Sequence, residues 1–310
     1  MRVVTNDGTF CGYGKGEDGQ LMAMTDEEYH SACPGMTSAA TKGIWSSPKS
    51  SPYPAPKGLV VLYQIGRGPF CPSVSPFPLK LETFLRFNKI PYMNIHSSRF
   101  SKKGKTPWIE YNGQAIADSQ FCIDFLSREL GIDMNSHLTP VDKSISRAFQ
   151  KMSEENTYWS MCYEMFAVPD KTRIAEVMPQ YKGFKLWAFT TVFSRVIKKE
   201  LYYQGIGRHS DEEIWTIGRA DLQAISTFLG DKKFFMGDRP SQIDCAMFGM
   251  LAQVLWHMPR TRHEKFTHDR LQNIDGYCER MKELCWPDWD KLCLKHPSYQ
   301  DDNYKTYHTE

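Results

Sequence analysis

The hydroxyl of Ser75 is the side chain best placed for chemistry, within SVSPFPLKLE at residues 73–82. An apolar run at 59–63, typical of a buried strand, precedes it, and apolar residues spaced along one helix face follow it. Ser75 is a favoured N-cap residue, and Pro76 suits the first helical position because no N–H is needed there. The first turn of a helix also favours negative charge. The Ser75 hydroxyl is therefore expected either to cap this helix or to donate to a thiolate and keep the sulfur ionised.

Composition and charge set the class of protein. The 310 residues are enough for two domains, and the 38 basic and 36 acidic residues give a net charge of +2, which offers no electrostatic basis for nucleic-acid binding. The nine cysteines are an odd number without a C-x-x-C pair, which indicates a reducing compartment. No apolar run approaches the ~20 residues that span a bilayer, and the first residues lack the apolar core of a secretory signal. We expect a cytoplasmic protein, with any membrane association peripheral.

The two ends of the chain lack helix or strand periodicity. Residues 1–56 are dominated by Gly, Ser, Thr and Pro, which is typical of a disordered tail. Residues 291–310 are polar and are also predicted to form a tail. We therefore expect residues 57–290 to fold without either end.

Residues 57–135 predict a small α/β domain. The strand at 59–63, the helix after Ser75 and a second strand at 92–96 form a β-α-β unit. The two strands of such a unit are parallel, and their crossover is right-handed.

A β-hairpin and a helix complete this domain. Two short strand-like runs flank Asn112-Gly113, a strong signal for a type I′ turn, and predict a hairpin at 108–117. Asp118-Ser119 then begins a helix, and Gly131 ends it. The hairpin adds antiparallel neighbours to the parallel pair, so we expect a small mixed sheet.

Residues 136–290 predict a helical domain. Apolar residues recur at helical spacing and indicate five helices, at about 145–166, 187–197, 214–229, 243–255 and 273–286. Ser241 and Asp244 resemble a capping box before the fourth of these helices. His257, His263 and His268 fall in a stretch that is interpreted as a solvated loop, and their spacing does not match a metal-binding helix. We therefore predict no metal site.

A β-α-β unit and a hairpin followed by helices resemble the cytosolic glutathione S-transferase fold. A closer resemblance, to the failed axon connections family, is carried by three segments: GRGPFCPSVSPFPLKLETFLRF, GKTPWIEYNGQAIADSQF and GDKKFFMGDRPSQIDCAMFGMLAQVLW. That family is similar to metaxins and to cadmium-responsive glutathione-transferase-like proteins. The resemblance covers about residues 57–290. It implies a thioredoxin-like α/β domain at 57–135 followed by an all-α domain at 136–290.

The resemblance also implies a site that takes glutathione as a substrate. Thr106-Pro107 matches the family's cis-proline, which exposes the preceding backbone to the cysteinyl part of glutathione. Asp118-Ser119 matches the acidic-serine pair that binds the γ-glutamyl end, although Asp-Ser is also an ordinary helix start. Ser75 stands where omega-type transferases have a reactive cysteine. A serine there can activate glutathione but cannot form a mixed disulfide with it, which leaves conjugation as the chemistry.

Two functions remain open at this point. In one, the protein is an interaction module in axon and neuronal development, as the family name implies, with partner proteins or a second copy of the chain. In the other, it conjugates glutathione to a small electrophile and Ser75 stabilises the thiolate. The cleft beside Ser75 should be open in an enzyme and filled by Phe70 and Phe77 in a module. Cys71 is interpreted as an ordinary loop thiol. If replacing Ser75 by alanine left the conjugating activity unchanged, Cys71 and Tyr158 would be the next residues to test.

Overall fold

The computed structural model divides into two compact units, Met1–Ser47 and Pro48–Glu310, and describes residues 2–4, 10–15, 21–24, 57–97, 100–168, 170–179 and 181–307. The first unit holds three short strands in an antiparallel sheet, namely β1 (Arg2–Val4), β2 (Phe10–Lys15) and β3 (Leu21–Met24). The prediction of disorder at 1–56 was wrong for these strands, because runs of three to six residues are too short to show a period. The rest of that prediction lies outside the described residues.

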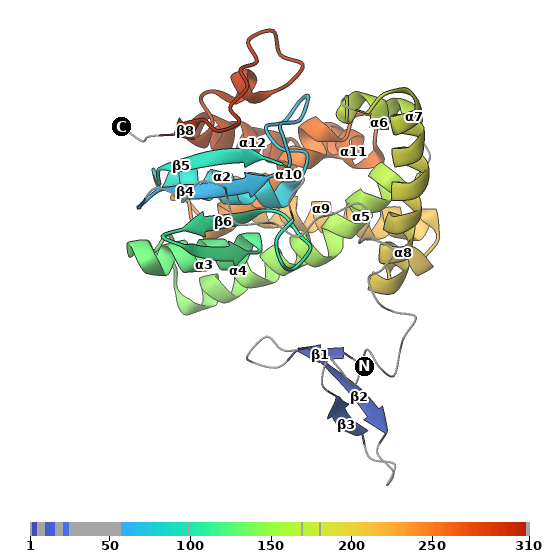
Figure 1. Ribbon diagram of the computed structural model, residues 1–310, viewed down its shortest axis with the longest axis horizontal. Coiled ribbons are helices and arrows are strands. Elements are labelled where there is room, and N and C mark those ends of the chain that lie inside the picture. Colours follow the sequence, from blue (N-terminus) through green and yellow to red (C-terminus); the bar gives the residue numbers. More distant parts are fainter. Residues whose placement is uncertain are drawn as a thin grey trace. The chain divides into compact units, whose positions relative to one another are not determined.

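A five-stranded sheet forms the α/β part of the second unit, in the order β7-β6-β4-β5-β8 (Figure 1). The central strand β4 (Val60–Gln64) is buried along its length and pairs in parallel with β5 (Tyr92–His96). On its other side β4 pairs antiparallel with β6 (Trp108–Tyr111), which forms a hairpin with β7 (Gln114–Ala117). Both turn residues of the hairpin have positive φ, as a type I′ turn requires. The predicted β-α-β unit, hairpin and mixed sheet are confirmed.

The edge strand β8 (Thr306–Tyr307) comes from the end of the chain and pairs antiparallel with β5 (Figure 1). The ring of its second residue stacks on Tyr92, with centroids 4.8 Å apart. The prediction that 291–310 is a tail outside the domains was therefore wrong. Asp302 in this segment bonds to Arg67, 235 residues earlier, and no local sequence pattern reveals a contact of that span.

The helices α2 (Pro76–Phe87) and α3 (Ser119–Leu130) pack on one face of this sheet. Their shared core includes Leu62 of β4, Phe84 of α2 and Leu126 of α3, none of which has exposed surface. Because both helices are anchored on β4, their first turns are held at the end of the sheet where the predicted site residues lie. Gly131 has a φ of 66° and ends α3, as predicted.

The helical domain confirms the five predicted helices and adds to them. Its α-helices are α4 (Pro140–Met152), α5 (Tyr158–Cys162), α6 (Lys171–Val177), α7 (Gly183–Ala188), α8 (Ser194–Gln204), α9 (Asp211–Leu229), α10 (Gln242–Ala252), α11 (Arg262–Arg270) and α12 (Gln272–Cys285). Several follow one another through π-helical turns, at Ser153–Thr157, Tyr163–Ala167, Phe189–Phe193 and Gln253–His257. No helix among the described residues is long and apolar enough to span a bilayer.

The interpretation of the histidine-rich stretch as a solvated loop was wrong. Residues 262–270 form α11, and the N-cap Thr261 accepts a hydrogen bond from the N–H of Glu264. His257 and His263 are 2% and 0% exposed, and burial lowers the pKa of each to about 4. Both histidines are therefore neutral at neutral pH. A neutral imidazole can occupy a core position, which a count of polar residues in the sequence does not reveal.

The helix α10 lies at the centre of the helical domain, and every residue from Ile243 to Ala252 is buried. The predicted capping box is confirmed, because Asp244 Oδ2 accepts hydrogen bonds from the N–H of Ser241 at 2.8 Å and from its hydroxyl at 3.0 Å. Asp244 Oδ1 also accepts from the N–H of Phe235 at 2.7 Å. These bonds fix the start of α10, which packs against α2 and so supports the helix that follows Ser75.

Gly249→Ala is expected to lower the free energy of unfolding by about 1–3 kcal/mol, the usual cost of overpacking. A Cβ there would lie 2.6 Å from the Pro76 carbonyl oxygen and 3.0 Å from the Lys80 nitrogen, both rigid backbone of α2. Gly276→Ala is the matched control, because its methyl would meet only the flexible end of Arg280 at 3.4 Å. That substitution should raise stability by up to about 1 kcal/mol through helix propensity. Urea unfolding measures both, and a neutral Gly249→Ala would contradict the close packing of α2 on α10.

Candidate glutathione site

Ser75 occupies the N-cap position of α2, with an extended backbone (φ −140°, ψ 141°), but its side chain makes no capping hydrogen bond. The expectation of a side-chain cap was therefore wrong. A capping oxygen bonds the N–H of the second or third helical residue; Pro78 at the third position has no N–H, which leaves the N–H of Phe77 as the one possible partner, and the Ser75 side chain does not bond to it. The proline at this third helical position can be read from the sequence. The backbone N–H of Ser75 donates instead to Ser73 Oγ, at 3.2 Å.

The first turn of α2 offers fewer donors to an anion than an ordinary helix start. Pro76 and Pro78 lack N–H groups, and the N–H of Leu79 is bonded to the Ser75 carbonyl at 3.4 Å. Phe77 therefore supplies the one backbone N–H of this turn that no helical bond uses. A thiolate at this position would rely on the Ser75 hydroxyl more than a thiolate at a fully donating helix start would.

The peptide bond Thr106-Pro107 is cis, as predicted. It immediately precedes β6, and Thr106 Oγ1 donates to the carbonyl of Tyr63 at 3.4 Å. Because Tyr63 lies near the end of β4, this contact places the cis-proline beside the start of the loop that carries Ser75. The structure thus places the cis-proline beside β4, the strand that precedes the loop to Ser75.

Asp118 is the N-cap of α3, and its carboxylate accepts from the N–H groups of Gln120 at 2.9 Å and Phe121 at 3.3 Å. Its backbone has a φ of 87° and a ψ of 130°, which is unusual for a residue with a side chain. Such strain costs about 1–3 kcal/mol and often marks a functional site. Ser119, the next residue, is buried. The predicted helix start is confirmed, and the exposed Asp118 also borders a groove of about 570 Å³ beside α3 and α4.

A buried lysine joins the two helix starts of the site. Lys80 of α2 is 2% exposed, and its ammonium donates to Gln120 of α3 at 2.7 Å and to Glu154 of the helical domain at 2.6 Å. Charged hydrogen bonds of this kind are short and directional. Lys80 therefore fixes the turn after Ser75 relative to the turn after Asp118.

The two phenylalanines expected to decide whether the site is open lie in different places. Phe70 packs against the core of the helical domain, and the ammonium of Lys295 lies 4.4 Å from the centre of its ring. Phe77 contacts Tyr158 of α5, with ring centroids 5.0 Å apart. Phe70 is therefore part of the domain packing, while Phe77 and Tyr158 form an aromatic boundary next to the turn that follows Ser75.

Neither Tyr158 nor Cys71 is ionised, so neither can act as a base toward a thiol. The pKa of Tyr158 is raised by the neighbouring Cys162 and by burial, so its phenol stays protonated and keeps a hydrogen to donate. Cys71 has no exposed surface, and burial raises the pKa of its thiol. An unactivated thiol agrees with the interpretation of Cys71, although the residue is buried rather than exposed on its loop.

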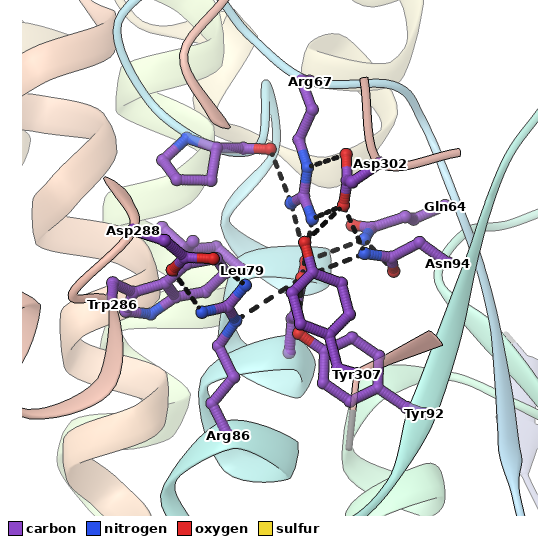
Figure 2. Close-up of polar contacts among 12 residues, drawn as sticks. Gln64, Arg67, Leu79, Arg86, Tyr92, Asn94, Trp286, Asp288, Asp302 and Tyr307 are labelled. Atoms are coloured by element: carbon purple, nitrogen blue, oxygen red, sulfur yellow. Dashed lines mark hydrogen bonds and ion pairs between the residues drawn. The ribbon is translucent and has the colours of Figure 1, made fainter. Parts of the chain in front are cut away.

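A buried polar network that the sequence analysis missed holds the Ser75 loop in place (Figure 2). Arg67 makes a two-point contact with Glu82 of α2, at 2.8 Å through Nη1 and 2.7 Å through Nη2. The same guanidinium donates to the Pro72 carbonyl at 3.0 Å and, through Nε, to Asp302 at 2.9 Å. Arg67 therefore ties the loop before Ser75 to α2 and to the C-terminal segment.

The second guanidinium of the network belongs to Arg86, which lies one turn after Glu82 on α2. It bonds to Asp288 at 2.6 Å and lies 4.1 Å from the centre of the Trp286 ring (Figure 2). Burial alone would raise the pKa of Glu82, but Arg67 and Arg86 outweigh it and hold that pKa well below its usual range. The spacing of Glu82 and Arg86 at i and i+4, inside an otherwise apolar helix, was the one local signal of the network.

Comparison with known proteins agrees with this geometry. The family model for the Glutathione S-transferase N-terminal domain matches residues 76–172, and that for the Glutathione S-transferase, C-terminal domain matches residues 218–281. Among solved structures, the beta-etherase LigF from Sphingobium has a TM-score of 0.52 at 14% identity, over 72% of this chain and 94% of that one. A glutathione S-transferase of Ceriporiopsis subvermispora, solved in complex with glutathione, has a TM-score of 0.50 at 19% identity, over 78% and 99%. The fold is therefore that of the glutathione S-transferases.

Proteins with similar sequences show which glutathione S-transferase-like proteins this chain resembles. Failed axon connections of Drosophila melanogaster is 36% identical over 77% of this chain and 61% of its own length. The isoprene-epoxide glutathione S-transferase of Rhodococcus is 28% identical over 68% of this chain and 93% of its own, and mouse metaxin-2 is 19% identical over 77% and 92%. The chain is a glutathione S-transferase-like protein, and its sequence is similar to that of Failed axon connections and, more distantly, to those of the metaxins. It spans less than two thirds of the Drosophila protein.

Proposed function

We propose that this protein binds glutathione beside the start of α2 and adds its sulfur to a small electrophile. The observation that carries the proposal is the Ser75 hydroxyl, which the fold holds at a helix start and leaves without a capping bond. In this proposal the hydroxyl donates to the glutathione sulfur and stabilises the thiolate, which then attacks the electrophile. The 28% identity to an isoprene-epoxide glutathione S-transferase supports an electrophile of small size.

The peptide part of glutathione is assigned to the other site residues. The backbone at Thr106, before the cis-proline, pairs with the cysteinyl unit. Asp118 and Ser119 hold the γ-glutamyl end, and the strained φ of 87° at Asp118 supports a role beyond that of an ordinary helix cap. The thiol releases its proton to solvent, the thiolate adds to a carbon centre, and the electron pair passes to the leaving group or to the oxygen of the opened ring, which takes a proton from solvent. The protein supplies position and one charge-assisted hydrogen bond, so no redox step is involved.

Calorimetric titration of the full chain with glutathione tests this proposal. Binding at or below millimolar glutathione, and binding of S-methylglutathione of similar strength, would support the assignment of affinity to the peptide contacts. Turnover of an epoxide in the presence of glutathione then tests the chemistry. Protein that neither binds glutathione at millimolar concentration nor consumes the epoxide would overturn the proposal.

A second candidate function is that of an interaction module, and one surface feature favours it. The α7–α8 segment exposes a row of large apolar side chains, with exposed fractions of 77% for Phe184, 52% for Trp187 and Val192, 42% for Val196 and 64% for Tyr203. Single exposed apolar residues are normal, but a series along one helical segment is typical of a contact surface. A role in axon development, taken from the name of the Drosophila relative, would use this surface. Failure of the glutathione titration would favour this candidate.

The cytoplasm is the proposed location for either function. The seven cysteines from Cys71 to Cys293 are free and buried, as suits a reducing compartment.

A further inference from the structure

Three side chains with metal-ligating atoms lie together outside the glutathione site. They are His96 at the end of β5 and Asp301 and Asp302 in the C-terminal segment, and one ligand atom from each lies within 4.8 Å of the others. We propose that these three residues bind a divalent cation of the Zn²⁺ class, which fastens the C-terminal segment to the sheet. The proposal concerns a different site from the glutathione proposal and does not depend on it.

The imidazole of His96 is the observation that points to a ligand. Its side chain is 10% exposed, and its Nε2 has no hydrogen-bond partner among the described residues. Buried polar atoms nearly always have a partner, and an ion is one of the ordinary explanations for an orphan. Nε2 lies 3.6 Å from Asp302 Oδ1, beyond hydrogen-bonding distance, so it faces the carboxylate without bonding to it. The backbone N–H of His96 donates to Asn303 Oδ1 at 2.9 Å, which holds this residue beside the C-terminal segment.

The spacing suits a tetrahedral metal. With metal–ligand bonds of about 2.0–2.2 Å, two ligand atoms of a tetrahedral site lie about 3.3–3.6 Å apart. The 3.6 Å between His96 and Asp302 falls at the end of that range. Asp301 is exposed, so rotation of its side chain can bring its carboxylate into place. One imidazole and two carboxylates suit Zn²⁺ better than Ca²⁺ or Mg²⁺, which prefer oxygen ligands throughout.

Asp302 keeps a lone pair for the metal despite its other contacts. Its Oδ2 accepts from Asn94 at 2.9 Å and from the Tyr307 hydroxyl at 3.0 Å, and it also contacts Arg67 (Figure 2). Its Oδ1 accepts one hydrogen bond, from Arg67 Nε at 2.9 Å. A carboxylate oxygen has two lone pairs, so the second one of Oδ1 is left for a cation.

The charge of the surrounding network also suits a divalent cation. Arg67 would repel a cation if it stood alone, but it belongs to a group in which two guanidinium groups face four carboxylates. The guanidinium groups are those of Arg67 and Arg86, and the carboxylates are those of Glu82, Asp288, Asp301 and Asp302. The group therefore carries two more negative than positive charges. The buried Arg67, Arg86, Glu82 and Asp302 balance one another, so the excess comes from Asp288 and Asp301 at the rim, and a divalent cation would offset it.

Binding of the metal would hold the C-terminal segment more tightly against the sheet. Strand β8 pairs with β5 through two residues, and a ladder of that length holds weakly by itself. His96 ends β5, while Asp301 and Asp302 shortly precede β8. A metal bridging these residues would add a second connection between β5 and the segment that leads into β8, and so reduce local opening.

Zinc titration of the full chain, after removal of metal by chelation, tests the proposal. Native mass spectrometry should show one bound ion, and hydrogen exchange at residues 301–307 should slow about tenfold or more, while Tm rises by roughly 5 °C at a hundredfold excess over Kd. Asp301→Asn and His96→Gln should each weaken binding about 10–100-fold or more. His268→Gln is the matched control, because His268 pairs with one carboxylate, that of Asp275 at 2.9 Å, and it should bind zinc like the unaltered protein.

Three results would overturn the proposal. The first is the absence of a bound ion in the unaltered protein. The second is equal zinc binding by Asp301→Asn and His268→Gln, and this comparison stands even if His96→Gln fails to fold, because Asp301 is exposed. The third is a thiolate charge-transfer band when Co²⁺ replaces Zn²⁺, which would place the metal on cysteines.

Discussion

Asp302→Ala is expected to lower the free energy of unfolding by about 3–5 kcal/mol, the usual cost of removing one partner from a buried ion pair. The Asp302 side chain is 1% exposed, and its loss leaves the buried guanidinium of Arg67 with Glu82 as its remaining carboxylate partner within the network. Loss of the bonds to Asn94 and Tyr307 loosens β8 as well. Urea unfolding of the full chain in the presence of a chelator measures the change.

The neighbouring carboxylate provides the control. Asp301→Ala alters an exposed side chain and, without metal, should change stability by less than about 0.5 kcal/mol. A chain ending at residue 290 loses every contact of Asp302, so it should be at least as unstable as Asp302→Ala. This revises the expectation that residues 57–290 fold as well without the C-terminal segment. Equal stability of the Asp301 and Asp302 variants would contradict the role given to the network.

The stability difference should also depend on pH. Burial would raise the pKa of Asp302, but its bonds to Arg67 outweigh burial and the net pKa is lowered. A carboxylate whose pKa is lowered by folding stabilises the protein above its unfolded pKa of about 4, and this contribution is lost as the pH falls. The gap between the unaltered protein and Asp302→Ala should therefore be widest near neutral pH and narrow below about pH 4. A gap that widens on acidification would show that the ion pair is not its source.

Ser75→Ala is expected to lower kcat for glutathione conjugation by about 10²–10³-fold while leaving the affinity for glutathione nearly unchanged. Removal of one donor to a developing anion has an effect of this size in comparable anion sites, and the prolines of this helix start leave few other donors. The peptide contacts lie elsewhere, so binding of the ground state should persist. Steady-state kinetics and calorimetry on the same preparation separate the two effects.

The free energy of unfolding distinguishes Ser75→Ala from the neighbouring substitution Ser73→Ala. The Ser75 side chain forms no capping bond, so Ser75→Ala should change the free energy of unfolding by less than about 0.5 kcal/mol. Ser73→Ala should show the opposite pattern, because Ser73 is fully buried and its Oγ accepts the N–H of Ser75. Its loss should cost about 1 kcal/mol with a smaller effect on kcat. Unchanged turnover in Ser75→Ala would move the activation of glutathione to another group.

The local elements of the fold follow from the sequence, since each depends on residues close together in the chain. Asn112-Gly113 specifies its hairpin turn because the turn needs positive φ at two successive residues. Gly131 ends α3 for a similar reason, and the apolar spacing of α10 reflects a helix buried on all sides. The helix start at Asp118-Ser119 follows from its residue types as well, and the cis-proline could be located through resemblance to a known family.

Contacts between distant parts of the chain were decided by the tertiary structure. The pairing of Arg67 with Asp302 joins residues 235 positions apart, and the burial of His257 depends on helices packed around it. The same applies to the place of His96 beside Asp301. A charged or polar side chain is stable in the interior only when the fold supplies its partner or neutralises it. The partners here come from segments far apart in the chain. The sequence therefore determined the local elements, whereas only the tertiary structure placed the polar C-terminal segment in an edge strand and in a buried network.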